Sequence, residues 1–155
     1  MYRPAAEKEK IMRLSTKGRY AIRLMLDLAS NNTGEPIRLR DAARRQEISE
    51  KYLEQIVSLL NKAGFVRSIR GSQGGYVLSR MPKDYTVGEI LRLTEGSLSP
   101  VDCVDQLGLG CHREENCATR ILWQKLDEAI SSVVDHVTLE DLLSWQAAKA
   151  GDYVI

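Results

Sequence analysis

The chain has 155 residues, of which 43% are hydrophobic and 28% are charged, and this length and balance indicate one globular domain with at most a small appendage. No stretch approaches the roughly 18 apolar residues of a membrane span, and the charged start has no apolar signal-peptide core behind it, so we expect a cytoplasmic protein with no membrane contact. The net charge of +1 conceals an asymmetry, because residues 13–80 carry a net charge of +7 and residues 81–155 one of −7. A basic half suits contact with the phosphates of nucleic acid, although ordinary solvated surface charge would give the same count.

The first predicted elements are a leader and two helices. Residues 1–11 are polar and without pattern, so we expect a disordered leader. A helix is expected from Ser15, because apolar residues then recur at helical spacing and mark a core element; they are Ala21, Leu24, Met25 and Leu28. A short helix from Arg40 to Gln46 is expected after the break at 31–36.

A further amphipathic helix is predicted to begin at Ser49, which is a good N-cap residue. Its apolar stripe is formed by Leu53, Ile56, Val57 and Leu60, and the opposite side carries Lys51, Gln55, Ser58 and Lys62. The short helix, a turn at Ile48 and this second helix together fit a helix-turn-helix, in which the second helix enters the major groove of DNA.

A β-hairpin is predicted next. Two alternating segments, 65–70 and 76–80, flank the sequence Gly71-Ser72-Gln73-Gly74-Gly75, which is typical of a hairpin with a glycine-rich tip. A phosphate-binding loop is disfavoured, because no helix follows the glycines and no Gly-Lys-Ser/Thr occurs. We therefore interpret the hairpin as the wing of a winged helix-turn-helix.

The second half of the chain is predicted to hold a capped helix, a long loop and a long helix. Thr86-Val87-Gly88-Glu89 is a capping-box pattern that opens a helix through Leu93, and the loop from Gly96 to Asn116 is long enough to require a functional reason. From about Thr119 the apolar positions Leu122, Leu126, Ala129, Ile130, Val133 and Val137 form one stripe. That stripe exceeds what a small domain buries, so we expect it to pack against a second subunit, with packing inside one chain as the alternative.

Thr138 is expected to cap a last short helix. The predicted fold is therefore mainly α with a small β-hairpin: a winged helix-turn-helix domain followed by a long C-terminal dimerisation helix. The predicted organisation is a DNA-binding domain over 12–82, a linking helix and cysteine-bearing sensor loop over 83–118, and the dimerisation and C-terminal helices over 119–155.

Three cysteines, Cys103, Cys111 and Cys117, lie within one stretch of 15 residues. The number is odd, and disulfides rarely persist in the cytosol, so ligand or redox thiols are favoured over a structural bridge. Three soft thiolates suit iron in an iron–sulfur cluster. Zinc held by the three cysteines and His112, a purely thiol-based redox switch, or no ligand at all stay open as alternatives.

An enzyme is the least favoured class of function. His112 and His136 are the two histidines of the chain, and no nucleophile–base or paired-carboxylate arrangement stands out in the sequence.

Three motifs occur in order along the chain and are followed by the cysteine cluster. They are Met-Arg-Leu-Ser-Thr-Lys-Gly-Arg-Tyr-Ala at 12–21, Ser-Glu-Lys-Tyr-Leu-Glu-Gln at 49–55 and Arg-Gly-Ser-Gln-Gly-Gly-Tyr-Val-Leu at 70–78. Together they resemble the IscR-type family of winged-helix regulators, over residues 12 to about 145. The resemblance implies a transcription regulator, by expectation a repressor, that binds an imperfect palindrome in double-stranded DNA as a homodimer. The wing would lie in the flanking minor groove.

The same resemblance implies the DNA-contacting residues. By motif position Lys51, Tyr52, Glu54 and Gln55 would face bases or phosphates, and Arg70 would serve the wing. Gln pairs with adenine edges, Arg suits a narrow minor groove and Lys neutralises phosphate. Glu54 would accept from cytosine, or would instead only bridge Lys51 or Lys62.

For the cysteines, the resemblance implies a [2Fe–2S] or [4Fe–4S] cluster that senses iron, cluster supply or redox status. The seven-then-five spacing is similar to the iron-responsive RirA-like branch, whereas IscR and NsrR have five-then-five. A CymR-like branch controlled by protein contact, without cluster ligation, is the main rival.

The fourth ligand departs from the family pattern. Arg120 stands where IscR-like proteins have a histidine, and a guanidinium does not ligate iron. The acidic ligand that NsrR-like proteins have near the N-terminus is also absent, because its place falls near Arg19. His112 is the first candidate for a fourth ligand; the others are Asp102, Asp105, Glu114, Glu115 and an external small ligand.

Overall fold

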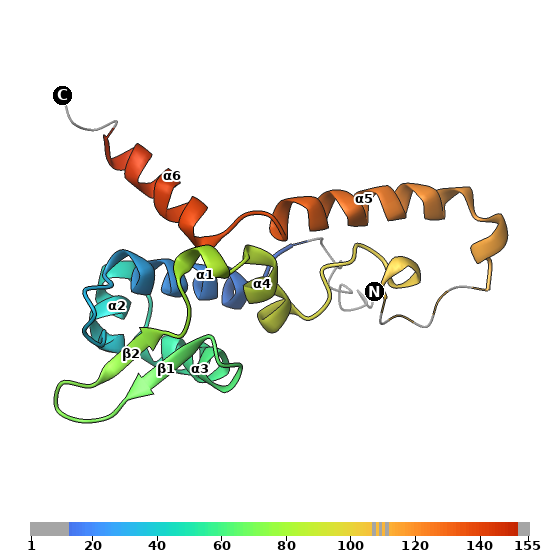
Figure 1. The fold of residues 1–155 in the computed structure, drawn as a ribbon. Coiled ribbons are helices and arrows are strands. Elements are labelled where there is room, and N and C mark those ends of the chain that lie inside the picture. Colours follow the sequence, from blue (N-terminus) through green and yellow to red (C-terminus); the bar gives the residue numbers. More distant parts are fainter. Residues whose placement is uncertain (1–12, 107, 109, 111, 152–155) are drawn as a thin grey trace, which may run out of the picture.

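The computed structural model describes residues 13–106, 108, 110 and 112–151, so the predicted leader 1–11 lies outside the described residues. The elements in chain order are α1 (Thr16–Ser30), α2 (Leu39–Gln46), α3 (Glu50–Lys62), β1 (Val66–Ile69), β2 (Gly75–Leu78), α4 (Val87–Glu95), α5 (Ala118–Val134) and α6 (Leu139–Gly151), with short 3-10 turns η1 (Pro82–Asp84), η2 (Asp102–Val104) and η3 (Glu114–Asn116). Figure 1 shows a body made of α1–α4 and the hairpin, from which α5 extends as an arm. No helix in the described ranges is long and apolar enough to cross a membrane.

The core of the body forms around α1. The predicted stripe of α1 is fully buried, and it packs with the buried faces of α3 and α4 and with Val66, Tyr85 and Leu139. Both predicted helix starts are confirmed, because Ser15 Oγ accepts from the N–H of Gly18 and Ser49 Oγ accepts from the N–H of Tyr52, each at 3.1 Å. The predicted fold, mainly α with one hairpin, is thus confirmed.

A buried carboxylate ties α1 to α2. Asp27 is 3% exposed, and its oxygens accept from Arg45 Nε at 3.0 Å, Arg45 Nη2 at 2.8 Å and Gln46 Nε2 at 2.9 Å. A buried charge is stable only when it is paired and hydrogen-bonded in this way. The network therefore fixes the first helix of the helix-turn-helix against the central helix of the core.

Tyr85 fastens the base of the hairpin. Its ring is completely buried, and its hydroxyl donates to the carbonyl of Phe65 at 2.6 Å while it accepts from the N–H groups of Ser79 at 3.0 Å and Arg80 at 2.9 Å. One side chain thus holds the residue before β1 and the residues after β2.

The Tyr85→Phe variant is expected to lose about 1–3 kcal/mol of unfolding free energy, because three half-buried backbone groups lose their partner while the ring is kept. Urea denaturation followed by circular dichroism measures the loss. Tyr76→Phe, at a half-buried position on β2, is the control and is expected to change stability less. Equal stability of the Tyr85→Phe variant and the native chain would show that the hydroxyl is not a structural fastener.

The region from α4 to α6 confirms the predicted caps and differs from two other predictions, the end of α5 and the length of α6. The capping box is confirmed, with Glu89 N–H bonding Thr86 Oγ1 at 3.2 Å and Thr86 N–H bonding Glu89 Oε2 at 3.0 Å. The arm ends at Val134 and does not continue to Val137, whose carbonyl accepts from the N–H of Val87 at 2.9 Å. Thr138 caps α6 as predicted, but α6 has 13 residues and is not short.

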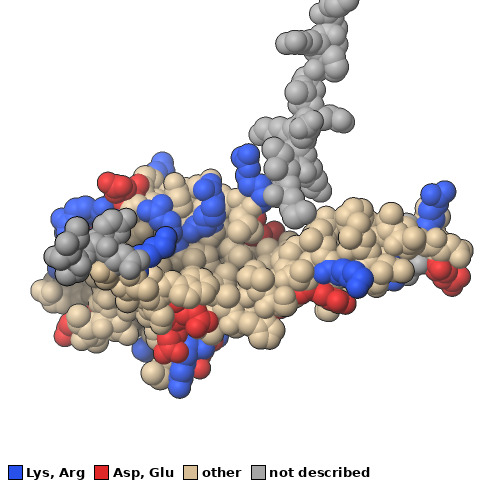
Figure 2. Space-filling model, turned by 90° about the horizontal axis from the view of Figure 1, so that it is seen from above, with Lys and Arg blue, Asp and Glu red and all other residues tan. Residues whose placement is uncertain are grey.

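The arm buries none of its residues within one chain. Three of its apolar side chains are more than half exposed: Ile121 at 58%, Leu122 at 55% and Val133 at 59%. On the face seen in Figure 2 the arm carries few charged side chains, whereas Lys and Arg gather over the body. A long helix whose apolar side chains stay exposed in one chain is the feature expected of a subunit interface.

Candidate nucleic-acid interface and cysteine loop

The outer face of α3 presents the predicted recognition residues. The apolar stripe of α3 is buried against the core, so the exposed face carries Lys51, Glu54 and Gln55. Glu54 forms no ion pair with Lys51 or Lys62 in the described chain. The carboxylate of Glu54 is thus accessible, and the simple bridging role is not seen.

Tyr52 differs from the other predicted contact residues, because it is half-buried. Its ring packs edge-on against Tyr20 of α1, with the centroids 5.7 Å apart and the planes at 81°. Arg23 lies over the other ring of this pair, 5.3 Å from the Tyr20 centroid. The ring of Tyr52 therefore anchors the start of α3 on α1 and holds Lys51 and Gln55 in place.

The hairpin lies on the same side of the body as α3, away from α6 (Figure 1). Its strands pair antiparallel with Val66 opposite Leu78 and Ile69 opposite Gly75, so Gly75 belongs to β2 rather than to the tip. Glycine is needed there, because a Cβ atom on Gly75 would collide with the carbonyl of Ile37. The close approach comes from a third short segment, since Ile37 bridges to Tyr76.

Arginines line this wing. Arg70 follows β1 directly and is exposed, as is Arg67 within the strand. Arg38 donates from Nη2 to the carbonyl of Ser72 at 2.9 Å, which ties the start of α2 to the tip of the wing. The contacts of Arg38, the N-cap of α2, and of Arg23, within α1, were not predicted from the sequence, because a single basic residue gives no signal of the element that its side chain meets.

Two of the three cysteines lie in the described residues, and both are half-buried. Cys103 is in η2, and Cys117 is the N-cap of α5. The Cys117 Sγ lies 3.2 Å from the hydroxyl oxygen of Thr119. This hydrogen bond, together with the N–H groups of Arg120 and Thr119 and the charge of Arg113, lowers the pKa of the Cys117 thiol, while burial opposes the shift. Cys111 lies outside the described residues.

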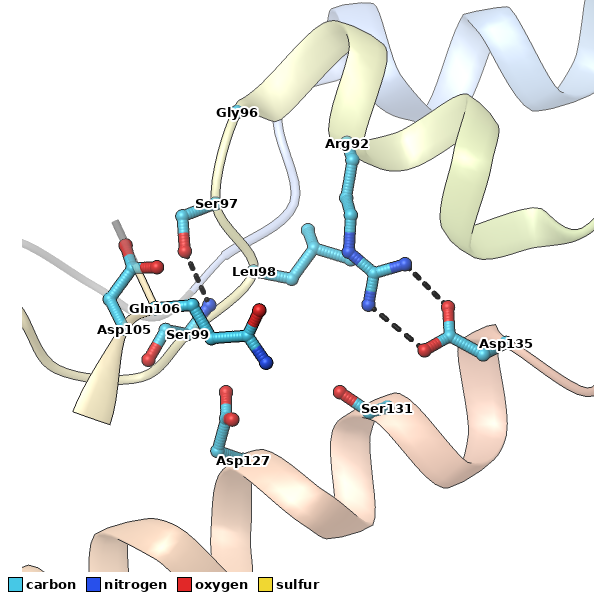
Figure 3. Close-up of a pocket in the computed structure, with 10 residues that line it drawn as sticks. All are labelled: Arg92, Gly96, Ser97, Leu98, Ser99, Asp105, Gln106, Asp127, Ser131 and Asp135. Carbon is cyan, nitrogen blue, oxygen red and sulfur yellow. Dashed lines mark hydrogen bonds and ion pairs between the residues drawn. The ribbon is translucent and has the colours of Figure 1, made fainter. Parts of the chain in front are cut away.

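The structure does not gather the described ligand candidates into one cluster. No group of three His, Cys, Asp or Glu side chains placed to hold a metal occurs among the described residues. The residues after η2, Asp105 and Gln106, share a pocket of about 630 Å³ with Asp127 and Ser131 in the second half of α5 (Figure 3). Cys117 lies at the other end of that helix, and His112 is exposed.

Comparison with known proteins identifies close relatives. The chain is 41% identical over 143 residues to the HTH-type transcriptional regulator CymR of Bacillus subtilis, covering 92% of this chain and 98% of that protein. It is also 41% identical over 135 residues to the HTH-type transcriptional regulator IscR of Erwinia tasmaniensis, covering 87% of this chain and 81% of that protein.

Solved structures of such relatives share the fold. The structure of B. subtilis CymR, described as the global cysteine regulator of that organism, superimposes with a TM-score of 0.74 over 87% of this chain and 98% of that one at 41% identity. The oxidized form of Staphylococcus aureus CymR gives a TM-score of 0.67 over 84% and 95% at 35% identity. The model of the family Rrf2, described as iron-dependent transcriptional regulator, matches residues 14–144. The chain therefore belongs to the Rrf2 family and is a DNA-binding transcription regulator rather than an enzyme.

Proposed function

We propose that this regulator is a cytoplasmic homodimeric repressor that binds an imperfect palindrome and senses iron, cluster supply or redox status through an iron–sulfur cluster on Cys103, Cys111 and Cys117. The observation that carries the sensing part is the set of three thiols on one loop that leads into the arm. The family description, iron-dependent transcriptional regulator, points the same way.

The DNA-binding part rests on the face shared by α3 and the wing. Gln55 and Glu54 are exposed on α3 and have the donors and acceptors that discriminate base edges in the major groove. Arg70 extends the surface to the neighbouring groove. Two such faces related by a two-fold axis match the symmetry of a palindrome.

The dimer part rests on the arm. Its exposed apolar residues gain a partner if two arms pack together, and this gain is absent in one chain. The proposed division into a DNA-binding domain over 12–82, a sensor segment over 83–118 and a dimerisation segment over 119–155 places the interface on α5 and α6.

The donor set fits an iron–sulfur cluster in its chemistry. Thiolates are the ligands that iron prefers in such clusters, and hydrogen bonds already lower the pKa of the Cys117 thiol. In this proposal Cys103 in η2 and Cys117 at the start of α5 would hold the cluster together with Cys111. When bound, such a cluster supplies an iron centre that oxygen, nitric oxide or iron shortage alters. His112 remains the first candidate for the fourth ligand.

The loop residues transmit this change to the arm. Cys117 is the N-cap of α5, so any movement of its thiol acts directly on the first turn of that helix. A shift of α5 changes the distance between the two recognition helices of the dimer. That distance must match the spacing between the two half-sites of a palindrome. Equal operator affinity of the apo and loaded forms would exclude this coupling.

Anaerobic purification tests the sensor. We expect a coloured protein with broad visible absorption and equivalent iron and sulfide, which the Cys103→Ala, Cys111→Ala, Cys117→Ala variant loses while keeping its helical circular dichroism. His112→Ala is the matched variant for the fourth ligand, and light scattering on the same samples measures the dimer. A native protein that stays colourless and iron-free after anaerobic reconstitution would overturn the cluster.

A thiol-based switch is the second candidate function. Its specific support is Cys117, which lies at a helix N-terminus with a lowered pKa, a change in the direction of the thiolate that oxidation requires. Alkylation kinetics distinguish the two functions. A thiol switch predicts that Cys117 reacts faster than Cys103 and that peroxide changes DNA affinity in the iron-free protein.

A further inference from the structure

An ion pair joins the C-terminal end of α5, here called the root of the arm, to α4. Neither of its residues belongs to the proposed DNA contacts or to the cysteine site. Asp135 is the C-cap of α5, and its carboxylate accepts two hydrogen bonds from the guanidinium of Arg92 on α4. The Nη2–Oδ2 distance is 3.1 Å, and Nη1 bonds Oδ1. Figure 3 shows the two groups facing each other at the edge of the pocket between α4 and α5.

The same contact rests on a buried glycine. Gly88, one helical turn before Arg92, lies against this ion pair: a Cβ atom there would displace the ends of the Asp135 and Arg92 side chains and would lie 3.1 Å from the carbonyl oxygen of Val134. The end of α5 therefore lies close to the backbone of α4, with the ion pair beside it. A side chain at position 88 would disturb the ion pair first.

Backbone bonds fix where the arm is attached. The N–H of Val87 donates to the carbonyl of Val137 at 2.9 Å, and the N–H of Leu139 donates to the carbonyl of Tyr85 at 3.0 Å. These bonds lie beyond Asp135 in the chain and hold the connection to α6. They do not fix the direction of the α5 axis, which depends on contacts made by α5 itself. No residue of α5 is buried in one chain, and its main neighbours are η2 and α4, so the ion pair and the glycine contact are the constraints that tie its C-terminal end to α4.

A small rotation at this root has a large effect at the far end. An α-helix of 17 residues is about 25 Å long at about 1.5 Å per residue, so a tilt of about 10° moves its far end by about 4 Å. That displacement exceeds the rise of about 3.4 Å between base pairs in DNA. The direction of the arm thus has to be fixed within a few degrees if one half-site spacing is to be preferred.

We propose that Arg92, Asp135 and Gly88 form an alignment clamp that sets the angle between the DNA-binding body and the dimerisation arm, and thereby the half-site spacing that the dimer selects. The inference rests on the proposed homodimer and palindrome. Arg92 and Asp135 are positioning residues and do not touch DNA in this assignment. Their side chains are 40% and 38% exposed, so the pair contributes little to overall stability, and its loss loosens the arm without unfolding the body.

The test is selection from a pool of random-sequence DNA duplexes, followed by sequencing of the bound duplexes. The native protein is expected to select one half-site spacing. Arg92→Ala, Asp135→Ala and Gly88→Ala are expected to select the same half-site sequence with a broader range of spacings. In direct binding, the variants lose preference for the native spacing over one changed by a base pair by about tenfold, equivalent to about 1.4 kcal/mol.

Two further variants separate alignment from general damage. The exchange Arg92→Asp with Asp135→Arg restores an opposite-charge pair and is expected to narrow the spacing distribution again. Glu89→Gln weakens the Arg80–Glu89 pair, which also involves α4 and has comparable exposure of 35% and 42%, and is expected to leave the spacing unchanged. Light scattering confirms that every variant compared is a dimer.

The outcomes distinguish this inference from the function on which it rests. A native protein that is monomeric, or that selects single half-sites, would overturn the proposed dimer and the clamp together. A native dimer with one preferred spacing, shared unchanged by all three clamp variants, would overturn the clamp alone.

Discussion

Replacing Gln55 and Arg70 together by alanine is expected to weaken binding to a selected operator about 100- to 1000-fold. Each well-placed contact to a base edge contributes about 1–3 kcal/mol of discrimination, and a combined loss of about 2.7–4.1 kcal/mol corresponds to that range. Both residues are exposed, on α3 and at the end of β1 respectively, so truncation leaves the core intact. Fluorescence anisotropy against operator and unrelated duplexes, at several salt concentrations, measures the effect.

The single variants are expected to separate two kinds of contact. Gln55→Ala reduces the ratio of operator to unrelated affinity, whereas Arg70→Ala also lowers the salt slope by about 0.9, the value for one phosphate neutralised. The control removes one amide and one positive charge from α6 through Gln146→Ala and Lys149→Ala, both exposed and remote from the wing (Figure 1). If the double variant kept native affinity, α3 and the wing would not be the binding face.

Asp27→Ala is expected to destabilise the protein by about 3 kcal/mol. Removing one partner of a buried ion pair costs about 3–5 kcal/mol, because the other charge stays behind without compensation. We expect a loss at the lower end of this range, because the Arg45 side chain is 35% exposed and its charge can be solvated by water once Asp27 is removed. The side chain of Asp27 itself is 2% exposed. Chemical denaturation of the native and variant proteins gives the difference.

A matched surface pair provides the comparison for Asp27. Asp41 lies 3.5 Å from Arg44 on α2, with side chains that are 35% and 80% exposed, and Asp41→Ala is expected to cost less than about 1 kcal/mol. Because both variants remove one carboxylate near α2, the difference between them isolates the effect of burial. Equal losses would mean that the Asp27 network does not stabilise the α1–α2 contact.

Local patterns predicted most of the body. The stripe of α1, the cap at Ser49, the capping box at Thr86 and the hairpin depend on residues close together in sequence, and each is found. Asp27 and Tyr85 were not anticipated. The first interacts with residues 18 and 19 positions further on, and the second bonds backbone groups up to 20 positions away. Such partners cannot be read from helical or alternating periodicity.

The end of the arm shows the same limit. Val137 continues the apolar spacing of α5, but the helix ends at Val134, and the Val137 carbonyl accepts from the N–H of Val87 in another element. In the candidate DNA-binding site, the exposure of Lys51 and Gln55 could be predicted from the apolar stripe on the opposite side of α3. The packing of Tyr52 against Tyr20 could not. The predicted cysteine site depends on Cys111, which lies outside the described residues, and so stays a prediction.

The absence of buried residues along α5 has a consequence for the proposed dimer, because folding of this helix and assembly would then be coupled. An isolated helix of this length is only marginally stable in water, and in one chain α5 receives little help from tertiary packing, with η2 and α4 as its main neighbours. Its amide hydrogens should therefore exchange with solvent much faster in dilute monomer than in dimer, while those of α1 exchange slowly in both. In the proposed dimer, subunit concentration thereby affects the conformation of the regulator, since ordering of the arm and association of the second chain would be one equilibrium.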